Sequence, residues 1–138
     1  RICQLVAPNS SDMATCHHCI GHIKLVQGDT FAAERAFRTA LAIERRLSGS
    51  KRTFAEAGLH NSLAAVLQTR GQYTEALQLQ EGALRLRETL AGSNTLDLAA
   101  SYNNLGELLQ DIGRIEEALA LHRKDYEIVA RVAPDSLR

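Results

Sequence analysis

The chain repeats itself with a period of 42 to 43 residues, and this period restricts its fold more than any other feature. Gly28, Gly71 and Gly113 are 43 and 42 residues apart. Each glycine is followed after five residues by an alanine and preceded by an aliphatic and a small residue, in the pairs Ile20-Gly21, Leu63-Ala64 and Leu105-Gly106. Val6-Ala7-Pro8 and Val132-Ala133-Pro134 are three periods apart, so the chain begins and ends at equivalent points of a repeat.

Within each period, the pattern predicts two helices joined by a short turn. The first unit has an inward set with the spacing of a helix, namely Ala33, Ala36, Phe37, Ala40, Leu41 and Leu47. We expect Asp12 and Thr30 to be N-caps, Gly28 to be the left-handed residue between the two helices, and Ser48-Gly49-Ser50 to end the second. The expected helices span about 12–27, 30–48, 53–69, 73–91, 95–111 and 115–132, and residues 1–6 are expected to end an earlier helix.

These helices should form one all-α array in which no pair buries its apolar face alone. We expect residues 1–11 to hold the remnant helix of a preceding repeat and a loop, and the three repeats to span 12–52, 53–94 and 95–138. Small residues should mark the close approach of the two helices in a pair, as Gly106 with Ala118.

Composition and charge exclude several function classes. Sixteen basic and sixteen acidic residues cancel, so the chain as a whole does not attract nucleic acid or anionic lipid. No apolar run is long enough to span a membrane, and three cysteines do not form a disulfide framework, which favours a cytoplasmic protein. The sequence has no phosphate-binding glycine loop and no nucleophile elbow, so we expect no enzyme activity and no cofactor.

The repeat unit resembles the tetratricopeptide repeat (TPR). The third unit carries its pattern as Tyr102, Leu105-Gly106, Leu109, Ala118 and His122. The second has His60, Leu63-Ala64, Leu67, Ala76 and Gln80, and the first has His17, Ile20-Gly21, Lys24, Ala33 and Phe37. The long period and the phrase Tyr102-Asn103-Asn104-Leu105 are similar to the kinesin light chain type of repeat. The resemblance implies a right-handed α-solenoid of three antiparallel helix pairs.

It also implies a non-catalytic scaffold that holds a protein or peptide in a concave groove lined by the first helix of each pair. Carried onto this sequence, the groove residues are His18, His22, Asn61, Ser62, Asn103, Asn104, Glu107 and Asp111. An Asn amide suits an extended peptide because it both donates to and accepts from a main chain. Ser62 and Cys19 replace the Asn that relatives carry at the position of Asn104, and a merely solvated helix face remains the alternative.

Two short motifs have a functional and a structural interpretation. Cys16-His17-His18-Cys19 with His22 contains metal-ligating residue types, but one helix cannot place four ligands around a zinc ion, so we expect packing and assign no metal site. Arg45-Arg46-Leu47-Ser48 resembles a substrate of basophilic kinases, whereas basic residues before Ser-Gly-Ser also suit the end of a helix.

Two other function hypotheses stay open at this stage. The array could be the structural or sensor arm of a larger ATP-dependent or kinase signalling protein and contact its own neighbouring domain. Alternatively, ends that resemble cut repeats could lead to self-association through their apolar faces.

Overall fold

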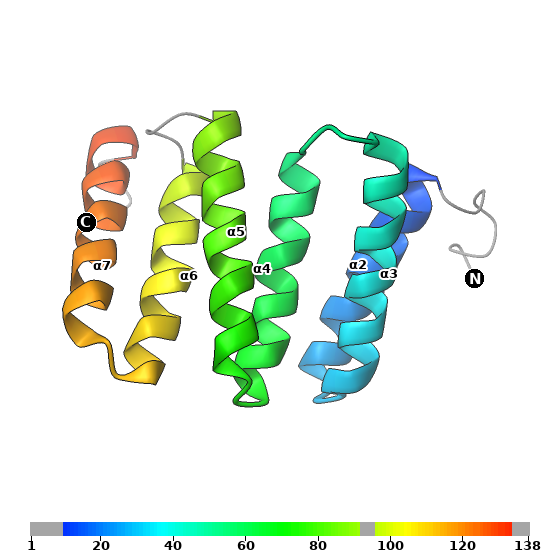
Figure 1. Ribbon diagram of the computed structural model, residues 1–138, viewed down its shortest axis with the longest axis horizontal. Helices are drawn as coiled ribbons and strands as arrows, with labels where there is room; N and C mark the ends of the chain where they lie inside the picture. The colour runs from blue at the N-terminus through cyan, green and yellow to red at the C-terminus, as the bar shows by residue number, and fades with distance from the viewer. Residues whose placement is uncertain (1–9, 92–95, 134–138) are drawn as a thin grey trace.

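The computed structural model describes residues 10–91 and 96–133, and within these ranges it contains six helices (Figure 1). They are α2 (Ser11–Val26), α3 (Thr30–Ser48), α4 (Phe54–Thr69), α5 (Tyr73–Ala91), α6 (Leu96–Ile112) and α7 (Ile115–Val132). Each agrees with an expected helix to within one or two residues, and the expected helix over residues 1–6 lies outside the described ranges.

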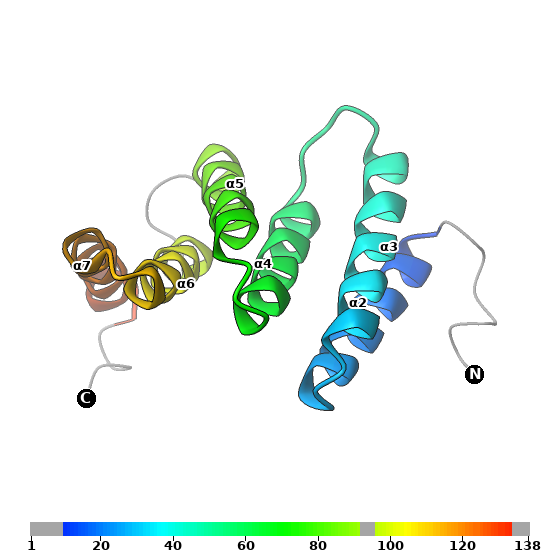
Figure 2. The same ribbon diagram turned by 60° about the horizontal axis from the view of Figure 1, so that its bottom comes forward.

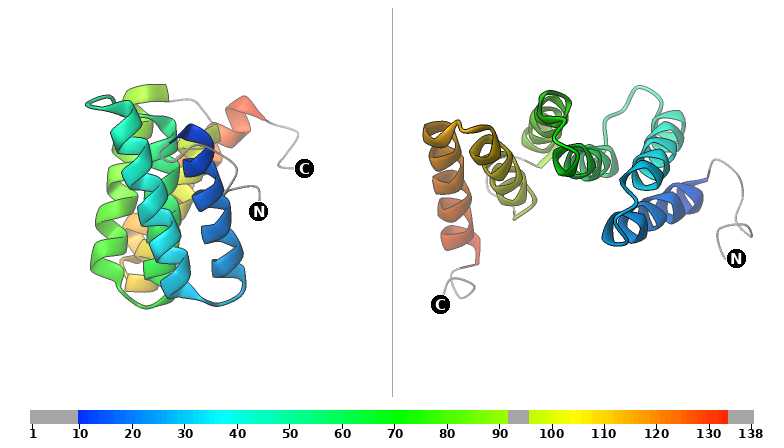
Figure 3. Two further views of the ribbon diagram at one scale, coloured as in Figure 1. Left: turned by 90° about the vertical axis from the view of Figure 1, so that its right-hand side faces the viewer. Right: turned by 90° about the horizontal axis from the view of Figure 1, so that it is seen from below.

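The helices form three antiparallel pairs stacked in a row, α2 with α3, α4 with α5, and α6 with α7 (Figures 1 and 3). The second helix of one pair also packs on the first helix of the next, so α3 contacts α4 and α5 contacts α6, whereas the first helices contact one another only slightly. This arrangement, which Figure 2 shows from another side, is the right-handed α-solenoid that the resemblance to TPR sequences implies.

A glycine in the left-handed region closes the turn inside each pair. Gly28, Gly71 and Gly113 have φ angles of 84°, 77° and 96°, as their spacing predicts. The expected N-caps were wrong by one or two residues. Ser10 Oγ accepts a hydrogen bond from Met13 N and Asp29 Oδ1 accepts one from Ala32 N, so both expected caps, Asp12 and Thr30, are helical residues.

The core runs along the row through small and branched side chains. Phe37, Ala33, Ala40 and Leu41 of α3 pack with Leu59, Leu63 and Val66 of α4. The expectation for Leu47 was wrong, because this side chain is 49% exposed. Ile43 is buried, because it lies three residues after Ala40 and therefore on the same inner face of α3.

In the second pair the small residues Ala64 and Ala76 pack in one buried cluster, as expected, whereas in the first and third pairs the glycine faces a ring of the second helix. A Cβ atom on Gly106 would lie 2.9 Å from the His122 ring, so His122, rather than Ala118, accounts for the glycine. Gly21 faces the Phe37 ring in the same way. Ala118 instead packs with Leu105 and Leu109 in the core of the third pair.

Candidate functional site

Three of the expected groove residues meet at one point between α2 and α4. His18 Nε2 lies 3.1 Å from Ser62 Oγ and 3.1 Å from His22 Nε2, and Ser62 Oγ lies 3.5 Å from His22 Nε2. His18 and His22 are four residues apart and therefore share one face of α2. This cluster forms a polar contact between the first helix of unit 1 and that of unit 2.

The histidine rings rest on the core side chain Phe37. Their ring centres lie 5.6 Å (His18) and 5.1 Å (His22) from the Phe37 centre, both in edge-to-face geometry. Burial lowers the pKa of His18, and the neighbouring His22 lowers it further. His18 is therefore neutral at pH 7, and it can donate or accept through Nε2 according to its tautomer.

Asn61 forms hydrogen bonds with two side chains of α5. Its amide, oriented to satisfy both neighbours, donates to Gln80 Oε1 at 2.6 Å and accepts from Arg87 at 2.6 Å. Arg87 also donates to Ser101 Oγ at 2.6 Å and so links α5 with α6. Asn61 is half-buried, and these contacts leave its amide less available to a ligand than its place in the repeat suggests.

The third unit supplies a second group of polar side chains. Gln68 Nε2 donates to Asp111 Oδ2 at 2.6 Å and connects α4 with α6. Asn103 Nδ2 donates to Glu107 Oε1 at 3.1 Å within α6, and Asn104 beside it is half-buried. Glu107 and Asp111 are exposed, so this part of the first-helix surface carries amides and carboxylates within reach of solvent.

The two short motifs take up ordinary positions in the helices. Cys19 is exposed, Cys16 is half-buried, and no three His, Cys, Asp or Glu side chains in the described part of the chain gather as a metal site. Ser48 ends α3 and donates to Glu44 Oε1 at 3.0 Å, and Gly49 follows with a φ of 63°. A phosphate on Ser48 would therefore meet the Glu44 carboxylate.

Among residues 10–91 and 96–133, no helix is long and apolar enough to cross a lipid bilayer. A family model described as tetratricopeptide repeat matches residues 54–130, which is more than half of the chain. The chain belongs to the tetratricopeptide repeat family. Repeats of this family generally serve as non-catalytic scaffolds for protein-protein interaction.

Solved TPR structures share the fold over most of this chain. BtubC (BKLC) from P. vanneervenii is 24% identical with a TM-score of 0.81, over 89% of this chain and 49% of that one. A putative kinesin light chain of Podosopora anserina with nearly identical TPR-like repeats is 20% identical with a TM-score of 0.76, over 94% and 61%. A single-substitution variant of the same Podosopora anserina protein gives 20% and 0.77, over 91% and 59%.

These neighbours are longer proteins, and this chain spans between 49% and 61% of their length. At this level of identity the likeness concerns the fold. No curated protein matches the sequence.

Two residues that shape the first-helix surface were not predicted from the sequence. Gln68 and Arg87 make contacts between units, and their partners Asp111 and Ser101 are 43 and 14 residues away. A spacing near one period is the only sign of the Gln68 contact, since equivalent residues of stacked units lie near one another.

Proposed function

We propose that the surface formed by α2, α4 and α6 binds an extended segment of a protein partner. The observation that carries this proposal is the row of polar side chains along the three first helices, which runs from His18, His22 and Ser62 to Asn103, Asn104 and Glu107. Histidine, hydroxyl, amide and carboxylate groups there can bind main-chain N–H and C=O groups in either direction.

Asn103 and Asn104 are the residues to test first, because both are half-buried on α6 and belong to no core cluster. We expect Asn103→Ala with Asn104→Ala to weaken partner binding and to leave the melting temperature almost unchanged. The experiment is a pull-down in which proteins retained by the wild type are identified and compared with those retained by the double variant.

The matched control is Thr74→Ala with Gln78→Ala, which removes two exposed polar side chains from α5. Partners of the first-helix surface should be retained by this control and lost by the α6 variant. If the α6 variant retains every partner of the wild type, the groove assignment is wrong.

A second candidate function, self-association, is supported by the apolar ends of the array. Leu119 and Tyr126 of α7 occupy the repeat positions of Leu77 and Leu84, which pack into the core of the third unit. On α7 they are 45% and 62% exposed. Such a surface fits a further repeat of a longer chain, a neighbouring domain in a signalling protein, or a second copy of this chain.

A further inference from the structure

A pocket lies at the seam between the first and second units, among α3, α4 and α5. It has a volume of about 360 Å³ and is lined by Arg45, Arg52, Glu56, His60, Gly82, Arg85, Leu86 and Thr89. Glu56 and His60 are four residues apart and share a face of α4 that differs from the face carrying Ser62. This seam pocket is therefore separate from the first-helix surface described above.

Charge is concentrated in the seam pocket. The Glu56 side chain is only 2% exposed, and its Oε1 accepts hydrogen bonds from Arg52 at 2.7 Å and from Arg45 at 3.4 Å. Arg85 forms no ion pair with any residue of the ranges that the structure describes. Three guanidinium groups and one carboxylate line the pocket, which leaves an excess of positive charge there.

His60 adds a neutral donor beside the arginines. Its Nε2 lies 3.4 Å from Nη2 of Arg45, and because a guanidinium only donates, Nε2 accepts and the proton is on Nδ1. Burial lowers the pKa of His60 despite the nearby Glu56, so the ring is neutral at pH 7. Its Nδ1 is buried without a hydrogen-bond partner among the described residues.

Gly82 keeps the space beside these groups open. A Cβ atom there would lie 3.6 Å from Nδ1 of His60 and 4.0 Å from Nη2 of Arg85. A longer side chain at this position would occupy the pocket between the imidazole and the guanidinium. The glycine in the middle of α5 is unfavourable for the helix by itself.

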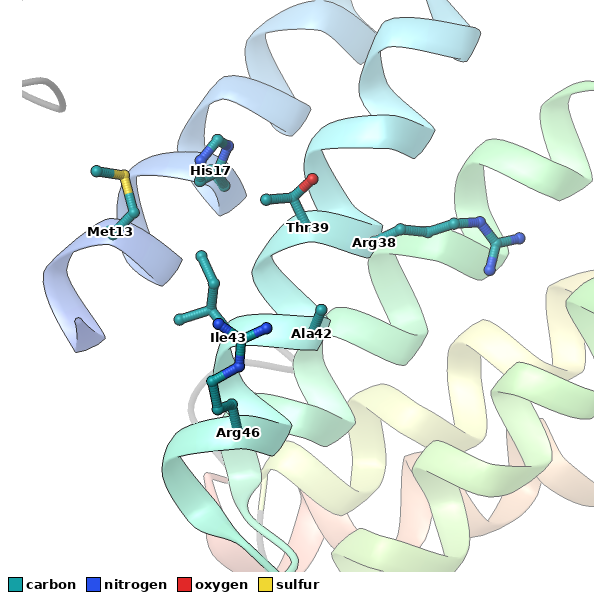
Figure 4. Close-up of a pocket in the computed structure, with 7 residues that line it drawn as sticks. All are labelled: Met13, His17, Arg38, Thr39, Ala42, Ile43 and Arg46. Atoms are coloured by element: carbon teal, nitrogen blue, oxygen red, sulfur yellow. The ribbon is translucent and has the colours of Figure 1, made fainter. Parts of the chain in front are cut away.

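The first unit contains an equivalent pocket with different chemistry (Figure 4). Six lining residues of the seam pocket have counterparts 43 residues earlier in the sequence. These counterparts line the pocket of the first unit and are Met13, His17, Thr39, Ala42, Ile43 and Arg46. There Met13 replaces the buried Glu56 and Ala42 replaces Arg85. The buried carboxylate and the arginine at the position of Ala42 thus distinguish the second unit.

The third unit fills the same place with apolar side chains. Leu98, Tyr102 and Ile128, which are 42 residues after Glu56, His60 and Leu86, pack in one buried cluster. Lys124, the counterpart of Gly82, places its Nζ 5.4 Å from the centre of the Tyr102 ring. Because apolar packing suffices at this position of the repeat, the charged and open version in the second unit calls for a ligand.

We propose that the seam pocket binds a phosphate monoester group through Arg45, Arg52 and Arg85. The guanidinium fork matches phosphate oxygens in pairs, and a doubly charged phosphate balances the positive excess better than a carboxylate does. The group is carried by a phosphorylated side chain of a partner or is free inorganic phosphate, and the two sources share this chemistry.

Binding is measured by NMR titration of the chain, in buffer without other oxyanions, with inorganic phosphate and with a phosphoserine peptide. The unphosphorylated peptide serves as the blank. Wild type should show saturable shifts of residues at the seam with a phosphorylated ligand. Tighter binding of the phosphopeptide identifies a phosphorylated partner, and equal affinity identifies the free ion.

Arg85→Gln should weaken this binding by roughly tenfold or more, because a charged hydrogen bond is lost. Gly82→Met should block the pocket without lowering the melting temperature, since methionine favours a helix. Arg46→Gln is the matched control, because it removes the same charge beside Arg45 from a residue that lines the other pocket, and it should leave the affinity unchanged. No saturable binding of either phosphate by the wild type, or equal binding by all variants, overturns the proposal.

Discussion

Gly21 and Phe37 are in such close contact that a Cβ atom on the glycine would lie 2.6 Å from Cδ1 and 2.8 Å from Cζ of the ring. Phe37 is completely buried and packs with both α3 and α4 residues, so its ring has no free direction in which to move. The same ring supports His18 and His22. The first-helix surface of unit 1 therefore depends on a glycine that does not itself reach that surface.

Gly21→Ala should lower the free energy of unfolding by about 1–3 kcal/mol, because the new methyl group overpacks the core. This loss should appear although alanine favours a helix over glycine. The measurement is urea denaturation followed by circular dichroism. Gly58→Ala in α4 is the control, since a Cβ atom there has no neighbour within 4 Å, and it should stabilise the chain by about 0.5–1 kcal/mol. Equal effects of the two substitutions would contradict this account of Gly21.

The helix pairs and their turns could be predicted from the sequence because their signals are local. Gly28, Gly71 and Gly113 recur at the period and close the turns, and apolar spacing defines the helix faces. The packing partner of Gly106 could not be predicted in this way. Its neighbour His122 is a polar residue with no apolar signal, and a ring contact across two helices depends on their crossing geometry.

The candidate site was predictable only as a row of positions. The resemblance to TPR sequences brought His18, His22 and Ser62 together, and the structure gives them mutual hydrogen bonds. Arg87 was missed, although it engages both Asn61 and Ser101. A long basic side chain on a second helix has many solvated conformations, and only the stacking of units determines which one it adopts.

The ion-pair network of Glu34 should make stability depend on acid pH. The hydrogen bond from Arg70, with further contributions from Arg38, lowers the pKa of Glu34 below its ordinary value of 4.5, against burial. A lowered pKa means that the stabilisation is complete above 4.5 and is lost as the pH falls through the folded-state value.

The difference in stability between wild type and Glu34→Gln should therefore shrink as the pH falls below 4.5 in a series of urea titrations. Glu127→Gln, at an exposed position of α7, is the control for removal of a carboxylate. A difference that stays constant across this range would show that the Arg70 contact does not act through the charge of Glu34.

His18 should produce a pH effect in a higher range. Its folded-state pKa is lowered below 6.5, chiefly by burial, so the unfolded chain binds a proton more readily. The free energy of unfolding is therefore highest above pH 6.5, and it decreases as the pH falls from this value through the lower pKa of the folded state. Wild type should thus lose more stability than His18→Gln between neutral and mildly acid buffer. His60 has the same direction of shift, and for this reason the variant must be compared with wild type at each pH.

The two ends of the array should attract each other. Tyr126 of α7 is 62% exposed where its counterpart Leu84 is packed, and Ile23 of α2 is 56% exposed where its counterpart Val66 is fully buried. Within the chain, α3 packs on α4 through the Val66 position. Helix α2 of a second copy can therefore pack on α7 of the first copy, just as the first helix of one unit packs on the second helix of the preceding unit. This gives a head-to-tail contact between the two copies.

We expect light scattering across a dilution series to show an average mass that rises with concentration. Tyr126→Asp should shift this rise to higher concentration, because a carboxylate then faces the apolar surface of the next copy. Tyr73→Asp is the matched control, since it makes the same substitution at an exposed tyrosine of α5, and it should behave as the wild type does. A constant monomer mass in the wild type would exclude assembly of this chain alone. The exposed apolar residues of α2 and α7 would then be contact surfaces for further repeats of a longer chain or for a neighbouring domain.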